Sequence, residues 1–133
     1  MDIFIFELIA HCKPTHNIIG CTRHLFRKAD TLNGLRPVRS VAVNGIIGKK
    51  YVEQLGIHQA IGKTFVASWA HASLISVPQL MNNGCWVLGV GESMHVRDKR
   101  GRVVVQGKRM RSGLFMARDE DLFHYDEDDA HLG

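Results

Sequence analysis

A run of basic side chains in the last third of the chain is the pattern with the clearest chemical meaning. Between positions 97 and 111, seven Lys and Arg residues accompany a single acid, Asp98. Cationic side chains along an exposed ribbon neutralise backbone phosphates, and Arg also reads guanine edges in a duplex groove. We therefore predict a nucleic-acid-binding site made of Arg97, Lys99, Arg100, Arg102, Lys108, Arg109 and Arg111. The competing interpretation is a solvated sheet face without a ligand.

A cluster of His and Cys residues between positions 11 and 24 could bind a metal ion. Zinc favours thiolate and imidazole ligands in tetrahedral sets of four, and the candidates here are Cys12, His16, Cys21 and His24. The cluster contains no CxxC pair and matches no zinc-finger spacing. We therefore prefer buried cysteines with exposed histidines, and keep zinc, or a small Cys/His enzyme centred on residues 11–24, as the second alternative. No residue is assigned a catalytic role.

The glycine-rich segment 56–64 resembles a phosphate-binding loop, but its glycines do not have the spacing that such a loop requires. Five residues separate Gly56 from Gly62, where a Walker A loop has four. The segment before it also reads as a helix, whereas the loop needs a preceding strand. We interpret Gly62 as the join between two helices.

The C-terminal strands are expected to form a hairpin. Residues 85–97 and 102–114 are rich in β-formers, and Asp98-Lys99-Arg100-Gly101 suits a type I turn with a G1 bulge. That turn predicts pairs whose residue numbers sum to 200, such as Val96 with Val104 and Met94 with Gln106. Arg97, His95, Arg109 and Arg111 then share the opposite face. Because this face contains no aromatic residue, duplex or backbone contact is favoured over base stacking.

The rest of the chain predicts an α+β fold. Helices are expected over residues 15–28, 49–61 and 64–76, and a short strand over 38–43, while residues 3–10 suit a buried strand or helix equally. The resulting prediction is a small single domain with one antiparallel sheet packed against two or three helices.

Charge is unevenly distributed along the chain. Residues 1–118 hold all 17 basic residues and six acids, a net charge of +11, whereas residues 119–133 hold seven acids and no Lys or Arg. We expect residues 1–118 to form the domain and residues 119–133 to form a flexible acidic tail. A cationic body attracts polyanions, and an acidic tail competes for the same surface.

Composition narrows the function classes. The three cysteines, the absence of a basic signal-like start and the absence of an apolar run of about 18 residues predict a cytoplasmic protein outside the membrane. The leading hypothesis is a non-enzymatic accessory factor that binds DNA or RNA through the basic hairpin and is modulated by its tail. The alternative is a protein–protein interaction module, such as an inhibitor, immunity or assembly protein, that binds an acidic protein surface. A homo-oligomer is left open.

Overall fold

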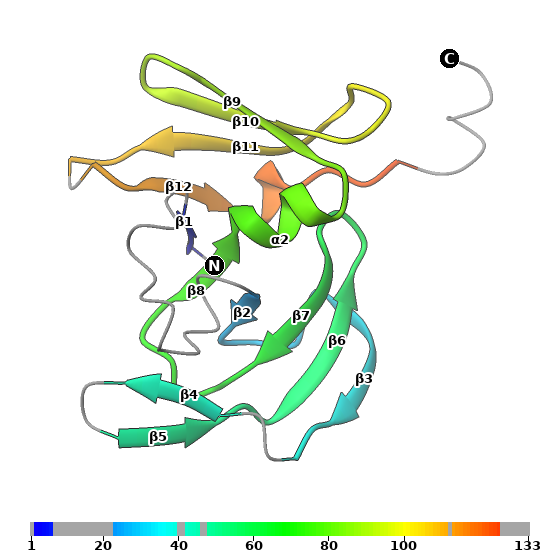
Figure 1. Cartoon of the computed structure of the whole chain (residues 1–133), viewed down its shortest axis with the longest axis vertical. Helices are drawn as coiled ribbons and strands as arrows, with labels where there is room; N and C mark the ends of the chain where they lie inside the picture. The colour runs from blue at the N-terminus through cyan, green and yellow to red at the C-terminus, as the bar shows by residue number, and fades with distance from the viewer. Residues whose placement is uncertain (1, 7–22, 40–41, 46–47, 112, 126–133) are drawn as a thin grey trace.

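The computed structural model describes residues 2–6, 23–39, 42–45, 48–111 and 113–125. Ten strands form one mixed sheet in the order β3-β6-β7-β2-β8-β1-β12-β11-β10-β9, and β4 and β5 form a separate hairpin (Figure 1). The strands of the large sheet are β1 (Asp2–Phe6), β2 (His24–Phe26), β3 (Leu32–Pro37), β6 (Gln54–His58), β7 (Gly62–Val66), β8 (Ser73–Ser76), β9 (Trp86–Val90), β10 (Ser93–Arg97), β11 (Val103–Arg109) and β12 (Phe115–Arg118). The hairpin consists of β4 (Ala42–Gly45) and β5 (Gly48–Tyr51).

The predicted α+β class is wrong, because the chain is nearly all β. Helix α2 (Val77–Asn82) is the one α-helix among the described residues, and a 3₁₀ turn, η2 (Asp119–Asp121), follows β12. Residues expected as helices at 49–61 and 64–76 instead supply β5 to β8. Side chains along β6 and β7 alternate in burial with the period of two that a strand requires. None of the helices described could span a membrane.

The other secondary-structure predictions, for residues 3–10, 15–28 and 38–43, agree with the structure only in part. Residues 2–6 are a strand, one of the two options, while residues 7–22 lie outside the described part of the chain. The end of the helix expected over 15–28 is strand β2. The strand expected over 38–43 corresponds to β4, which begins at Ala42.

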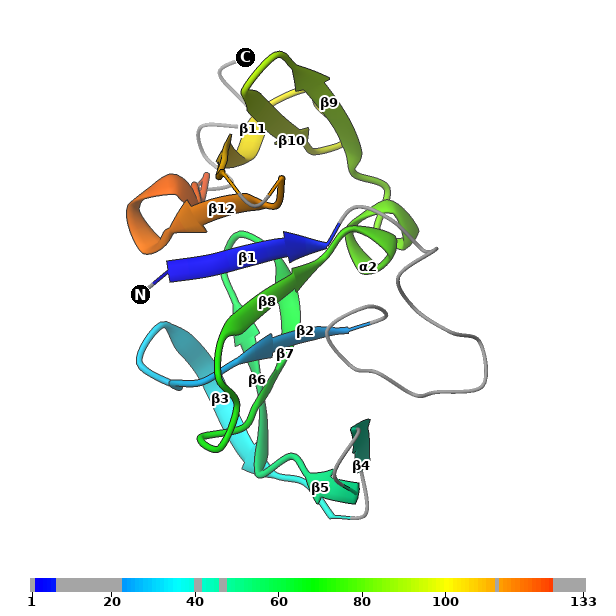
Figure 2. The ribbon, with the colours of Figure 1, turned by 90° about the vertical axis from the view of Figure 1, so that its left-hand side faces the viewer.

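Strands β1 and β8 join the two halves of the sheet. They pair in parallel with each other, and β1 also pairs with β12 while β8 pairs with β2. Figure 2 shows β9 to β12 on one side of this central pair and β2, β3, β6 and β7 on the other. The main core contains buried side chains from both halves, including Phe26, Ile75 and Val105. The sheet therefore folds around one shared interior.

Residues 119–125 pack against β11. The backbone N–H of Phe123 donates to Val104 O at 2.9 Å, and the Tyr125 hydroxyl donates to Val103 O at 2.8 Å. His124 Nδ1 lies 3.3 Å from Gln59 O in the β6–β7 turn. This segment thus bridges the two halves of the sheet. The predicted acidic tail begins inside it, and residues 126–133 lie outside the described chain.

The turn at residues 98–101 is confirmed. The N–H of Gly101 donates to Asp98 O at 2.9 Å, and Gly101 has φ 79°, which a side chain would disfavour. Asp98 also accepts hydrogen bonds from the N–H groups of Arg100 and Arg102 through its Oδ1 atom. Local sequence chemistry was sufficient to place this turn.

The predicted register of the hairpin is wrong beyond its first pair. Arg97 pairs with Val103 as expected, but a β-bulge follows, and Val96 pairs with Val105 instead of Val104. The extra residue lets Val104 and Val105 both enter the core, where each is buried. Every pair beyond the bulge is shifted by one residue, so the two faces of β11 are exchanged relative to those expected, while the faces of β10 are as expected.

The long strand expected over 85–97 is divided into β9 and β10, and the one expected over 102–114 ends at Arg109 and is followed by β12. β9 and β10 form their own antiparallel pair across Gly91 and Glu92, and β11 and β12 form another across residues 110–114. The C-terminal part of the molecule is therefore a four-strand antiparallel sheet, in place of a two-strand ribbon.

Gly107 in β11 faces the core and has no room for a side chain. A Cβ there would lie 2.9 Å from Ile5 Cδ1 and 3.1 Å from Met94 Cγ. We predict that Gly107→Ala lowers the free energy of unfolding by about 1–3 kcal/mol. Gly89→Ala is the matched control, since a Cβ at that position has no atom within 4 Å. Urea denaturation measures both, and equal stability of the two variants would contradict this packing.

Candidate nucleic-acid interface

The register of β9, β10 and β11 defines a solvent-facing side of the sheet, here called the outer face. Arg97 pairs with Trp86, His95 pairs with Leu88 on one side and Gln106 on the other, and Ser93 pairs with Lys108. Paired residues share a face, so the outer face consists of Trp86, Leu88, Ser93, His95, Arg97, Gln106 and Lys108. The intervening residues Met94, Val96 and Val105 are fully buried on the opposite side. These three strands contain no Asp or Glu.

Trp86 lies on the outer face, contrary to the expectation that this face has no aromatic residue. Its side chain is 47% exposed, although an exposed Trp is uncommon in a small domain. The Arg97 guanidinium lies 5.8 Å from the centre of its ring, within the range of a cation–π interaction. Residues 85–97 were expected to form one strand, whereas β9 folds back on β10 and pairs Trp86 with Arg97, so sequence analysis missed the aromatic partner of the basic site.

Arg97 is fixed by two contacts. Its Nη1 donates to Gly101 O at 2.7 Å, while the same guanidinium covers the Trp86 ring. A guanidinium has five N–H donors, so this single hydrogen bond leaves donors for a further acceptor. Holding the side chain in one position in advance reduces the conformational entropy lost on binding a phosphate.

His95 and Gln106 form the middle of the outer face. The Gln106 side-chain nitrogen lies 3.4 Å from His95 Nε2. Lys108 follows two residues later in β11, on the same face, and is exposed. The amide of Gln106 can both donate and accept, as base edges require. The outer face therefore combines an aromatic ring, two cations and neutral hydrogen-bonding groups.

Arg102, like Arg97, has side-chain partners close to the 98–101 turn. Arg102 Nε forms an ion pair with Asp98 Oδ2 at 2.9 Å, and its guanidinium lies 4.6 Å from the centre of the Tyr125 ring. Burial raises the pKa of Asp98, but hydrogen bonds from the backbone of Arg102 and Arg100 and from the Arg102 guanidinium outweigh it and hold that pKa below its usual value. Arg102 thus links the turn to the segment after β12, and Arg97 links the turn to Trp86.

The other predicted residues do not share one face. Lys99 and Arg100 are exposed in the turn, and Lys108 is exposed roughly 17 Å away along β11 at the usual rise per strand residue. Arg109 pairs with Phe115 and lies 5.7 Å from its ring, on the side of the sheet opposite the outer face. Arg111 is exposed in the β11–β12 turn. The bulge therefore separates Arg109 from Arg97.

Further cations lie on the neighbouring strands, where sequence analysis did not seek them. Lys108 pairs with Met116, and Met116 pairs with Phe4, so the same side of the sheet continues through β12 and β1. Arg118 lies beside it, 3.6 Å from the Asp2 carboxylate. A cavity of about 310 Å³ here is lined by Lys108, Met110, Met116, Arg118, Glu120 and Asp121. Only the pairing of distant strands brings these residues together.

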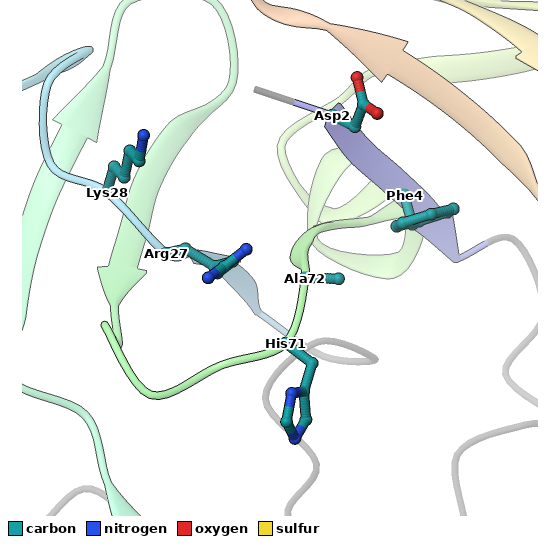
Figure 3. A pocket seen from close by; sticks show the side chains of 6 residues that line it. All are labelled: Asp2, Phe4, Arg27, Lys28, His71 and Ala72. Carbon is teal, nitrogen blue, oxygen red and sulfur yellow. The ribbon is translucent and has the colours of Figure 1, made fainter.

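A second cavity of about 340 Å³ lies farther along, between β1 and the ends of β2 and β8. Its lining is Asp2, Phe4, Arg27, Lys28, His71 and Ala72. In Figure 3 the side chains of Lys28 and Asp2 point upward from separate segments and that of His71 points downward, so their polar groups do not converge on one point. The cavity adds cationic surface, but its geometry does not form a catalytic site.

One residue of the metal-binding alternative, His24, lies in the described part of the chain. Cys12, His16 and Cys21 lie outside the described residues. His24 is fully buried in β2, where its Nδ1 accepts a hydrogen bond from the Ser76 backbone N–H at 2.9 Å. Across the described ranges, no three His, Cys, Asp or Glu side chains come together as a metal site needs.

The structure also argues against phosphate binding at the Gly56–Thr64 segment and against a nucleophilic role for Cys85. Gly56 to Thr64 belong to the β6–β7 hairpin, so the helix join expected at Gly62 is wrong and no helix N-terminus is there to hold a phosphate. Burial raises the pKa of the Cys85 thiol, followed in effect by Asp98. A nucleophilic cysteine requires the opposite shift.

Comparison with known protein families, with curated proteins and with solved structures gave no match for this chain.

The burial of His24 predicts acid sensitivity. Burial lowers its pKa from 6.5 to about 3, and burial also lowers the pKa of His58. The unfolded chain therefore binds protons that the folded chain does not, and stability falls as the pH decreases below about 6.5. We predict that the free energy of unfolding in urea declines between pH 7 and pH 4.5.

The variant His24→Gln separates this effect from general acid denaturation. It should be less stable at pH 7, since the contact with Ser76 is altered, but its decline toward pH 4.5 should be shallower than that of the wild type. A decline of equal steepness in both proteins would show that His24 is not the titrating group.

Proposed function

We propose that this protein is a non-enzymatic accessory factor that binds nucleic acid through the outer face and the adjoining 98–101 turn. One observation carries the proposal: three strands without an acidic residue present Arg97, Lys108 and Trp86 on the same exposed side. Lys99 and Arg100 extend the cationic surface at the turn. Phosphate contacts of this kind supply most of the sequence-independent affinity for nucleic acids.

The spacing of the cations suits an extended polyanion. The turn and Lys108 mark the two ends of β11, roughly 17 Å apart, a span that covers several phosphates of one strand. Arg118 continues the surface across β12. A small acidic ligand would contact only one end of this surface, whereas a nucleic-acid strand can contact both.

The acidic segment after β12 is placed where it can modulate binding. Glu120 and Asp121 line the same cavity as Lys108 and Arg118. Their carboxylates lower the local positive potential, so a phosphate approaching Lys108 must compete with them. This arrangement supports a role for the acidic tail as an internal competitor of the ligand.

An acidic protein partner is the second candidate, and the edge of β9 favours it. Edge strands are commonly protected by charges, proline or bulges. The opposite edge strand, β3, has Arg36, Pro37 and a bulge, whereas β9 has the uncharged sequence WVLGV. A partner strand could therefore pair with β9 while its acids contact Arg97.

Substitutions on the two sides of the sheet test the proposal. Arg97→Ala and Lys108→Ala should each weaken binding to a single-stranded or duplex oligonucleotide. Each should also reduce the slope of log Kd against log salt concentration by about 0.7 to 0.9 per lost phosphate contact. Fluorescence anisotropy across a salt series gives both quantities.

Arg109→Ala is the matched control, because it removes the same charge from the opposite side of the sheet. It should leave the salt slope nearly unchanged. Equal losses in all three variants would indicate a general charge effect instead of a defined face. If the wild type fails to bind DNA or RNA even at low salt, nucleic-acid binding is not its function.

A further inference from the structure

We infer that Trp86 is a stacking platform for an unpaired base, so that the ligand of the outer face is single-stranded nucleic acid. This inference rests on the proposed function and specifies its substrate class. It reverses the expectation from sequence, in which the supposed absence of an aromatic residue favoured a duplex. The observations that carry it are the position of Trp86 in the sheet, its partner Arg97, and the polar groups beside them.

Trp86 begins the edge strand of the sheet. β9 pairs with β10 on one side and, among the described residues, with no strand on the other. Its indole ring is about half exposed, and Leu88, two residues along the same face, is 45% exposed. The two side chains form an apolar strip at the rim of the outer face. A flat ring in this position can be covered from the edge side by another flat ring.

Arg97 makes this strip complementary to a nucleotide. It covers one side of the Trp86 ring and is held there by its hydrogen bond to Gly101 O. A base stacked against the indole therefore has a positioned guanidinium close to its phosphate. The charge complementarity favours a nucleic-acid strand over an uncharged aromatic ligand or an apolar peptide.

Polar groups next to the strip can contact the edges of bases. His95 pairs with Leu88 across the strands, and Gln106 follows in the next strand. In a duplex, base faces are covered by their neighbours and only the groove edges are accessible. An unpaired base exposes both its face and its pairing edge, so Trp86 and Gln106 can be used together only with a single strand.

The intrinsic fluorescence of Trp86 provides a direct test. The chain has two tryptophans, so Trp69→Phe leaves Trp86 as the sole indole. Single-stranded oligo(dT) or oligo(U) of 12 nucleotides should quench its emission saturably. A duplex of the same length should quench it much less. Trp86→Phe serves as the reverse variant, in which Trp69 should show no quenching by either ligand.

Affinity measurements form the second arm. Trp86→Ala should weaken binding of the single strand by about tenfold or more, the usual effect of removing a stacking aromatic residue, while Trp86→Phe should retain most of the affinity. Leu88→Ala is the matched control, because it removes exposed apolar surface from the same face without removing a ring. Far-UV circular dichroism shows that each variant is folded.

The outcomes separate this inference from the proposed function. If Trp86→Ala leaves single-strand affinity unchanged, or if the duplex binds equally well without quenching, stacking is overturned while nucleic-acid binding stands. If no oligonucleotide binds at low salt, both proposals fail. If, in addition, Trp86→Ala abolishes a self-association detected by sedimentation, the outer face is a protein interface.

Discussion

A one-residue bulge in β11 determines which side chains of that strand face solvent. Opposite Val96 and Arg97, the extra residue allows Val104 and Val105 both to be buried. Side chains alternate along a strand, so this shift exchanges the two faces of β11 beyond the bulge. Gly107 faces the core as a consequence, whereas Gln106 and Lys108 face solvent beside His95 and Ser93. Without this bulge, Lys108 would not share a face with Arg97.

The bulge is itself supported by the segment after β12. Phe123 donates a backbone hydrogen bond to Val104 O, and Leu122 forms a bridge with Val105. Tyr125 contacts Val103 O through its hydroxyl and Arg102 through its ring. The acidic end of the domain therefore stabilises the strand that positions the cations, while Glu120 and Asp121 lie near Lys108. Structural support and electrostatic modulation of the site arise from the same short segment.

Local chemistry could be predicted from the sequence, but long-range pairing could not. The turn at Asp98 and Gly101 follows from side-chain hydrogen bonding and positive φ, so it was found correctly. The helices expected over 49–61 and 64–76 were wrong because the apolar residues of each segment come from two strands and the chain between them. In the second segment, Val66 packs in the main core, while Phe65 and Trp69 pack against a smaller cluster formed by Leu25, Val52, Ala67 and Ala70. The spacing of these residues resembles one face of a helix, and periodicity over so short a stretch does not separate the two structures.

The candidate site was predicted in composition but not in geometry. Arg97 and Lys108 share an exposed face, yet Arg109 lies on the opposite side and Arg102 is paired with Asp98. Trp86 shares a face with Arg97 because the chain turns at Gly91 and Glu92, which pairs β9 with β10, whereas a single strand over 85–97 would keep the two residues far apart. Arg118 and Arg27 come near this surface only through the pairing of β1 with β12 and β8.

Nuclear magnetic resonance during titration with a single-stranded oligonucleotide tests most directly whether the outer face binds an unpaired strand at Trp86. The two indole N–H signals provide an internal comparison, because Trp69 Nε1 donates to Tyr51 O at 2.8 Å in the separate β4–β5 hairpin, whereas Trp86 begins the edge strand β9. We expect the Trp86 indole signal and the Gln106 side-chain amide signals to shift together with a common Kd, while the Trp69 signal stays in place. Shifts confined to Trp69, or no shift of either indole at saturating ligand, would contradict the account.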